Sequence, residues 1–147
     1  MKAIVQWVDG VQFVAETGSG HAIVADGAPE YGGRNTGPRP MELVLAGAAT
    51  CTAFDVVLML AKARQRFTRF QVVAEADRAE ADPKVFTAIR LIYRVGGTAL
   101  DAKVVERAVK LSKEKYCSAT AMLGRTAAVT TEIVLEDVAD AAGAERE

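Results

Sequence analysis

The chain has 147 residues, of which half are hydrophobic and a quarter are charged, and this composition is typical of one globular domain with a normal core. Its 18 Lys and Arg residues are balanced by 19 Asp and Glu residues, which leaves a net charge of −1. This balance excludes a general electrostatic attraction to nucleic acids or to anionic membrane surfaces. We therefore expect neither a nucleic acid nor a membrane as a partner.

The first 40 residues predict a small sheet followed by a long loop. Residues 3–8 and 11–16 are rich in β-forming side chains, and Asp9-Gly10 between them is a strong hairpin signal. A third strand is expected over 21–25, and Trp7 is expected in the strand core. Residues 26–40, DGAPEYGGRNTGPRP, then form a loop that is long enough to suggest function.

A long apolar helix is predicted from Pro40 to about Arg66. Proline suits the first helical turn, Glu42 favours the helix dipole, and a basic stretch from Lys62 ends the helix. Its middle is apolar on nearly every face, so we expect it to be buried all round. The uncharged apolar run 43–54 is shorter than the ~20 residues of a membrane span, so none is predicted.

The second half of the chain predicts three strands and two helices. The strands are expected over 70–76, 86–95 and 127–135, an amphipathic helix over 101–116, and a short helix over 118–123. The acidic, Ala-rich end 136–147 is expected to be loose. This order predicts a single α+β domain over 1–147, in which helices pack on an antiparallel sheet.

The two cysteines, Cys51 and Cys117, are 66 residues apart. A free cysteine is among the most buried residue types, so Cys51 can be a simple packing residue of an apolar helix. A thiol that reduces peroxides must instead be ionised, and a second thiol must trap its sulfenic acid before further oxidation. Cys117 begins its own helical segment, where amide groups favour a thiolate. The spacing leaves both interpretations open.

Other features indicate the compartment and the cofactors. The first ten residues contain no long apolar segment, so we expect no signal peptide and a cytoplasmic protein. In that compartment a permanent disulfide is unusual, whereas a reactive thiol pair is plausible. The chain has no CxxC motif and only one histidine, His21, so neither a metal nor another cofactor is predicted.

Two blocks of sequence carry a resemblance to a known family. The first combines Pro40, Glu42, the run LVLAGAAT and Cys51, and the second is AVKLSKEKYCSATAMLGRTAAVTTEIV around Cys117. Both are similar to the OsmC/Ohr family of osmotically inducible and organic-hydroperoxide-resistance proteins. The opening VQWVDGVQFVAETGSGHAIVADG and the KYCS block most resemble its YhfA-like branch. The resemblance covers residues 3–135.

The resemblance implies a fold, an assembly and a chemistry. The fold is an OsmC-like antiparallel sheet with a long central helix, built as an intertwined homodimer. The chemistry is thiol-dependent reduction of an organic hydroperoxide, with Cys51 as the peroxidatic and Cys117 as the resolving cysteine. A dithiol of the lipoamide type would return the disulfide to thiols. Family members brace the thiolate with an Arg and a Glu of the facing subunit.

The family's Arg and Glu, which brace the thiolate, do not have direct matches in this sequence. In the Ohr and OsmC branches the acid follows the proline directly, whereas here Glu42 stands one place later, about 100° further round the helix. The hairpin that carries the Arg in Ohr has none here, so Arg34 and Arg39 in the long loop are the stand-ins, with Arg125 as a third. These residues can equally be solvated loop charges and an ordinary acid at a helix start.

Helix geometry bears on the assembly. Glu42 and Cys51 lie nine residues apart, on opposite sides of one helix and about 13.5 Å apart along it. They can meet only between two antiparallel helices, which favours a dimer. An apolar pocket of Met41, Leu45 and Phe54 is expected to prefer alkyl peroxides. The alternative function is a dimeric binding or stress-response module, in which the cysteines are packing residues or slow redox sensors.

Overall fold

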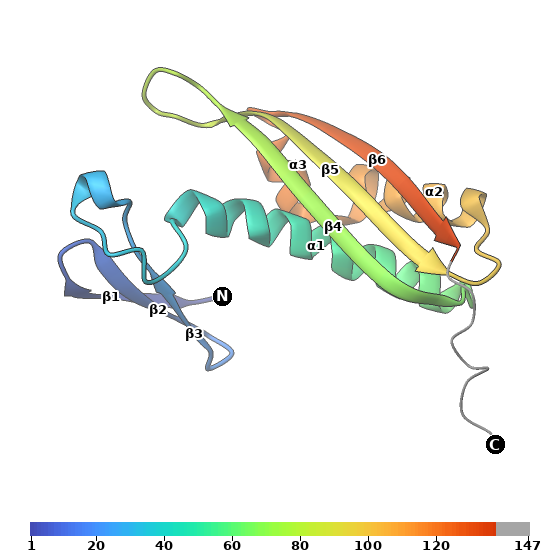
Figure 1. Cartoon of the computed structure of the whole chain (residues 1–147), viewed down its shortest axis with the longest axis horizontal. Coiled ribbons are helices and arrows are strands. Elements are labelled where there is room, and N and C mark those ends of the chain that lie inside the picture. Colours follow the sequence, from blue (N-terminus) through green and yellow to red (C-terminus); the bar gives the residue numbers. More distant parts are fainter. Residues whose placement is uncertain (138–147) are drawn as a thin grey trace. The chain divides into compact units, whose positions relative to one another are not determined.

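The computed structural model describes residues 1–137, which form two compact units (Figure 1). The first unit is Met1–Leu45, and the second begins at Ala46. Helix α1 (Pro40–Lys62) contains the boundary between them. The expectation of a single domain over 1–147 stays a prediction, and the expected loose tail lies outside the described residues from 138 onward.

The first unit is a three-stranded antiparallel sheet with the order β1-β2-β3. Its strands are β1 (Ala3–Asp9), β2 (Gln12–Thr17) and β3 (Ala22–Ala25), and a short 3-10 turn, η1 (Pro29–Tyr31), lies in the following loop. The hairpin predicted at Asp9-Gly10 is confirmed, and Gly10 has a φ of 55°, which glycine adopts at no steric cost.

The expected burial of Trp7 in a strand core is wrong for the single chain. Its side chain is 67% exposed, and its indole N–H donates to the Gly10 carbonyl at 2.9 Å. The reason is that the first unit has almost no interior of its own, since Ala25 and Asp26 are the only buried residues among Met1–Leu45.

Helix α1 begins at Pro40 as predicted but ends at Lys62 rather than at Arg66. Arg64 has a φ of 55°, the left-handed conformation that ends helices. The amide of Gln65 then donates to the Leu60 carbonyl, and the amide of Arg64 donates to the Ala61 carbonyl, both at 3.0 Å. These two bonds form a Schellman motif, which the composition of the segment did not reveal.

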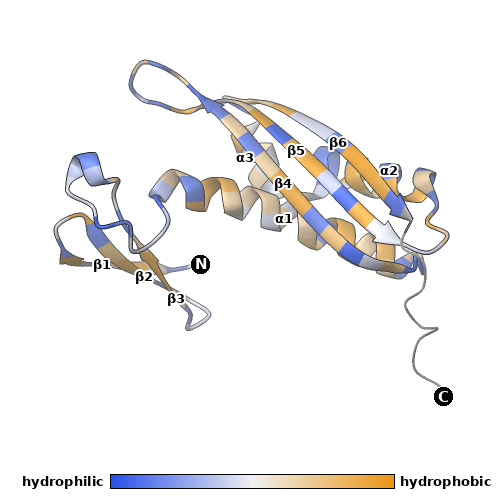
Figure 2. Ribbon diagram, viewed as in Figure 1, coloured by the Kyte–Doolittle hydropathy of each residue, from blue (hydrophilic) through white to orange (hydrophobic). Residues whose placement is uncertain are grey.

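The expectation that α1 is buried all round is wrong within one chain. Its buried residues recur every fourth position and form a single stripe: Ala48, Thr52, Val56 and Leu60. Phe54 and Leu58 remain 65% and 55% exposed, and Figure 2 shows apolar residues along most of α1. Among the described residues, α1 is long and apolar enough to cross a membrane by length and composition, which is weak evidence by itself.

The second unit contains a mixed sheet with the order β4-β5-β6. β4 (Phe67–Arg78) and β5 (Phe86–Gly97) pair antiparallel, whereas β5 and β6 (Ala128–Asp137) pair parallel. The expectation of an antiparallel sheet holds for β4 and β5 but not for β6, because the helical connection after β5 returns the chain in the same direction. Because β6 extends to Asp137, Glu136 and Asp137 belong to a strand rather than to a loose tail.

Helices connect β5 to β6 and help to build the core. α2 (Ala102–Leu111) is followed by a π-helical turn, η2 (Ser112–Tyr116), and by α3 (Ser118–Leu123), so the continuous helix expected over 101–116 changes geometry at Ser112. The large apolar side chains that are at most 2% exposed come from α1, β5 and α2: Val56, Leu60, Ile89, Leu91, Tyr93, Val95, Val105 and Val109. The α+β class is confirmed.

Candidate functional site

The second unit brings the elements that carry the two cysteines together. Cys51 is half-buried on α1, and Cys117 is 2% exposed between η2 and α3; both are free thiols. The amide of Cys117 donates to the Ser112 carbonyl at 2.8 Å, and its sulfur accepts from the amide of Thr120 at 3.4 Å. Cys117 thus ends a π-helical turn, a feature often found at functional sites, and caps α3.

The two thiols interact. Burial raises the pKa of the Cys117 thiol, hydrogen bonding to Thr120 acts against this, and hydrogen bonding and charge from the Cys51 side chain raise the pKa further. Residues 66 positions apart in the sequence are therefore neighbours in the fold. The raised pKa keeps the proton on Cys117 at neutral pH.

A buried chain of hydroxyl groups lies beside the thiols. The Thr52 hydroxyl is 2.6 Å from the Tyr93 hydroxyl and 2.8 Å from the Ser112 hydroxyl, and Ser112 donates to the Asp55 carboxylate at 2.9 Å. Thr52, Tyr93 and Ser112 are each 0% exposed. Burial raises the pKa of Tyr93, and the charges of Cys117 and Asp55 act in the same direction.

The sequence patterns did not indicate this chain of hydroxyl groups. The signal that was available is Thr52, a polar residue at a buried position between Ala48 and Val56 in the stripe of α1. A buried hydroxyl needs a partner, so its position predicts a polar contact. The sequence does not say that the partners are Tyr93 and Ser112.

An open hollow of 620 Å³ lies between α1 and α2 in the second unit. Apolar side chains make up much of its lining, with three charged residues among them: Leu58, Met59, Val104, Leu111, Tyr116, Asp55, Lys62 and Arg107. The residues expected to form an apolar pocket, Met41, Leu45 and Phe54, do not line this hollow. Within residues 1–137, no three His, Cys, Asp or Glu side chains are grouped so that they would hold a metal ion.

Arg34, Arg39 and Glu42 belong to the first unit and are paired there, whereas Arg125, the third stand-in, follows α3 in the second unit. The Arg34 guanidinium lies 3.1 Å from the Asp9 carboxylate, and the Arg39 guanidinium lies 3.5 Å from the Glu42 carboxylate. Glu42 also accepts the amide of Arg39 at 2.9 Å, which is the backbone bond of a capping box at the start of α1. The roles of Arg34, Arg39 and Glu42 beside a thiolate stay predictions.

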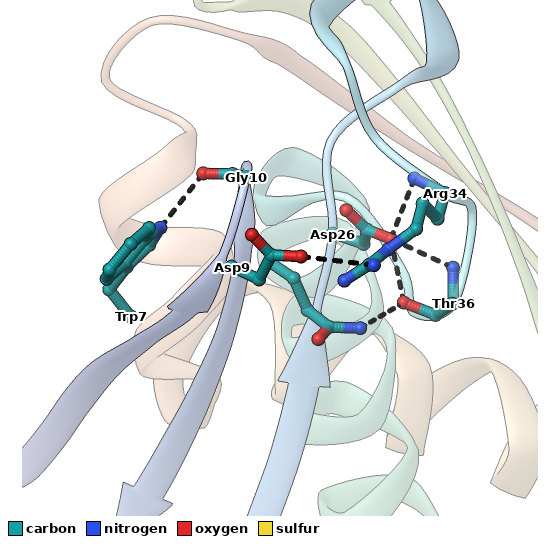
Figure 3. A network of polar contacts seen from close by, with 7 residues as sticks. Trp7, Asp9, Gly10, Asp26, Arg34 and Thr36 are labelled. Atoms are coloured by element: carbon teal, nitrogen blue, oxygen red, sulfur yellow. Dashed lines mark hydrogen bonds and ion pairs between the residues drawn. The ribbon is translucent and has the colours of Figure 1, made fainter.

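Asp26 organises the loop that carries Arg34 (Figure 3). Its carboxylate is 2% exposed and accepts the amides of Gly27, Arg34 and Thr36 at 2.8, 3.1 and 3.0 Å, and the Thr36 hydroxyl at 2.7 Å. Hydrogen bonding to the Thr36 side chain, followed by the backbone amides, lowers the pKa of Asp26 to about 2. Sequence analysis did not single out this residue.

The lowered pKa of Asp26 predicts a pH-dependent contribution to stability. The charged form is favoured in the folded chain, so its contribution is complete above the ordinary value of 3.8 and is lost as the pH falls toward about 2. The unfolding temperature of Asp26→Asn should therefore lie well below that of wild type at about pH 6. The difference between the two unfolding temperatures should narrow between about pH 4 and 2. Asp9→Asn, at an exposed carboxylate, is the control. A difference in unfolding temperature between Asp26→Asn and wild type that is constant with pH contradicts the prediction.

Comparisons with known proteins agree with this architecture. A family model described as OsmC-like protein matches residues 33–132. The chain is 43% identical over 133 residues to Protein YhfA of Escherichia coli K12, covering 88% of this chain and 94% of that protein. A hypothetical protein from Aquifex aeolicus VF5 has a solved structure with a TM-score of 0.82 at 28% identity, covering 94% of this chain and 97% of the other.

A more distant solved structure is similar in fold. It is an organic hydroperoxide resistance protein OsmC from Legionella pneumophila, with a TM-score of 0.64 at 18% identity, covering 90% of this chain and 96% of the other. At this identity the likeness shows the fold alone.

Proposed function

The chain belongs to the OsmC-like family, and on this premise we propose that it is a thiol-dependent peroxidase of organic hydroperoxides. Membership supports a redox or stress-response protein. The observation that carries the proposal further is the interaction of Cys51 with Cys117, two thiols that are remote in sequence. A peroxidase with a resolving cysteine requires such a pair.

The proposed reaction has two steps that balance. The Cys51 thiolate attacks the distal peroxide oxygen, the O–O bond breaks, and the alkoxide takes up a proton and leaves as an alcohol. The sulfur of Cys117 then attacks the sulfenic acid on Cys51, and hydroxide combines with the Cys117 proton and leaves as water. The raised pKa of Cys117 supports this order, because the proton stays on that thiol until it is needed. A dithiol of the lipoamide type then reduces the disulfide.

Apolar surface supports a homodimer as the working form. The resemblance to the OsmC/Ohr family implies a homodimer that acts on organic hydroperoxides. Phe54 and Leu58 are exposed on α1, and several large apolar side chains of the first unit are exposed as well: Ile4, Val5, Trp7, Val8, Ile23 and Val24. Soluble monomers rarely expose so much apolar surface. We propose that a second copy covers it.

The remaining assignments follow from the dimer. We propose that Arg34 or Arg39, with Glu42, braces the Cys51 thiolate from the partner subunit, since a guanidinium is a charge-assisted donor to a thiolate and to a developing alkoxide. We propose that an alkyl hydroperoxide is preferred over hydrogen peroxide, because the apolar Phe54 lies three residues after Cys51 on the same side of α1. We place the protein in the cytoplasm, where thiol reductants are available.

Intact mass after oxidation tests the proposal. Reduced protein is mixed with cumene hydroperoxide, and the wild type should lose two hydrogens per chain as Cys51 and Cys117 form a disulfide. Cys117→Ser should instead gain oxygen, because the sulfenic acid on Cys51 has no thiol to trap it. Unchanged mass in both proteins would reject the peroxidase.

The second candidate is a dimeric binding or stress-response module without turnover. The pairing of Arg34 with Asp9 and of Arg39 with Glu42 favours it, because these cations already have partners. The rate of alkylation by iodoacetamide at neutral pH separates the two functions. A Cys51 that reacts no faster than free cysteine supports the module, and a faster reaction supports the enzyme.

A further inference from the structure

The buried hydroxyl chain joins the two elements that carry the cysteines. Thr52 directly follows Cys51 on α1, and the carbonyl of Ser112 holds the amide of Cys117 at 2.8 Å. The Thr52 and Ser112 hydroxyls are 2.8 Å apart. One side-chain hydrogen bond therefore links the neighbour of the first thiol to the residue that anchors the second.

We propose that Thr52 and Ser112 are positioning residues, whose buried hydrogen bond holds Cys51 and Cys117 in the geometry needed for disulfide formation. The inference deepens the proposed function and rests on it for its biological meaning. Neither hydroxyl is assigned a contact with the substrate.

The number of hydroxyl hydrogens fixes which group donates in each bond of the hydroxyl chain. The Ser112 hydroxyl donates to the Asp55 carboxylate, which only accepts when ionised, and each hydroxyl has a single hydrogen. Thr52 must therefore donate to Ser112, and Tyr93 must donate to Thr52. Thr52 is thus both donor and acceptor, and a side chain without a hydroxyl at this position breaks two bonds at once.

Directional bonds matter here because apolar packing is not directional. Two such bonds connect α1 with η2, one between Thr52 and Ser112 and one from Ser112 to Asp55. The buried residues of α1 and α2 are mostly apolar, and apolar packing tolerates small shifts along and around a helix. A disulfide is less tolerant, since its Cα atoms must lie within roughly 4.4–6.8 Å and its torsion near a right angle. A hydrogen bond between groups that are 0% exposed is not replaced by water when the elements shift.

Core stability alone does not require these hydroxyl groups. Apolar side chains of the same shape can replace a buried hydrogen-bonded pair at nearly no cost to stability. Replacing Thr52 alone takes the partner away from the buried Tyr93 hydroxyl, so it also lowers the stability of the reduced protein. The stability of the disulfide is therefore measured separately, as an equilibrium between the reduced and the oxidised protein. A positioning role changes the stability of the disulfide.

Thiol–disulfide equilibrium with glutathione provides the test. Thr52→Val keeps the side-chain shape and removes the hydroxyl, Thr52→Ser restores it, and Thr50→Val is the matched control. Thr50 is on the same helix, is exposed, and bonds only to the Ala46 carbonyl of its own helix at 2.8 Å. Thr52→Val should lower the equilibrium constant for the Cys51–Cys117 disulfide about tenfold, which corresponds to a potential about 30 mV less negative. Thr52→Ser and Thr50→Val should stay at the wild-type value.

The outcomes separate this inference from the peroxidase proposal, because glutathione disulfide replaces peroxide as the oxidant. A wild-type equilibrium constant in Thr52→Val, even with a lower unfolding temperature, overturns the positioning role. A wild type that forms no Cys51–Cys117 disulfide with glutathione also overturns it. If Thr52→Val lowers the equilibrium constant of the disulfide while the wild type does not consume cumene hydroperoxide, the peroxidase proposal fails and the positioning role stands. Should Thr52→Val not fold, Ser112→Ala breaks the same bond from the other side, together with the bond from Ser112 to Asp55, and is judged by the same values.

Discussion

Replacing Cys51 with serine is expected to lower the rate of organic hydroperoxide consumption at least about a thousand-fold. A serine hydroxyl is not ionised at neutral pH and does not attack the peroxide oxygen, so the first bond is never formed. The assay follows cumene hydroperoxide in the presence of dihydrolipoamide. Cys51 is half-buried and serine is close to it in size, so the variant should keep the fold.

Cys117→Ser is the matched control for this prediction, since it removes the other thiol of the pair. Without reductant it should consume about one peroxide per chain, because the Cys51 thiolate is still present. With dihydrolipoamide its turnover should be slower than that of wild type and should decline as Cys51 is over-oxidised. Circular dichroism shows whether both variants are folded. A folded Cys51→Ser protein that keeps the wild-type rate would assign the activity to another group.

Placing acidic side chains at the exposed apolar positions of α1 is expected to separate the dimer. Phe54→Asp combined with Leu58→Asp puts two charges on a surface that we propose is covered by a second copy, and burying unpaired charges is very costly. Dimer affinity should fall at least about a thousand-fold. The molecular mass obtained from sedimentation velocity should then change from twice 15.6 kDa in wild type to 15.6 kDa in the variant.

The stability of the single chain should change little in the same variant. Phe54 and Leu58 are 65% and 55% exposed within one chain, and surface substitutions usually have small effects. Ala81→Asp adds a similar charge at an exposed position between β4 and β5 and should remain dimeric. A wild type that sediments as a monomer of 15.6 kDa would refute the dimer at this surface, and so would a double variant that still sediments as a dimer.

Local patterns predicted most elements, because short-range chemistry starts and ends them. Asp9-Gly10 makes the hairpin, and Pro40 begins α1. The errors occurred where a distant or conformational factor intervenes. The left-handed Arg64 ends α1 early, the π-helical turn begins at Ser112, and the return of the chain through α2 and α3 makes β6 parallel to β5.

Periodicity and the two cysteine-bearing blocks were enough for the α+β class and the family, since both depend on residue types at short spacing. The pairing of Cys51 with Cys117 was expected only from the family resemblance of these blocks. Neither signal indicated that Thr52 bonds to Tyr93, 41 positions away, and to Ser112, 60 positions away. Contacts of this kind leave no repeat in a sequence, because they depend on how α1, β5 and η2 pack against one another. The candidate chemistry of this protein comes from that packing: it joins a thiol pair and a hydroxyl chain from three separate elements in one buried region.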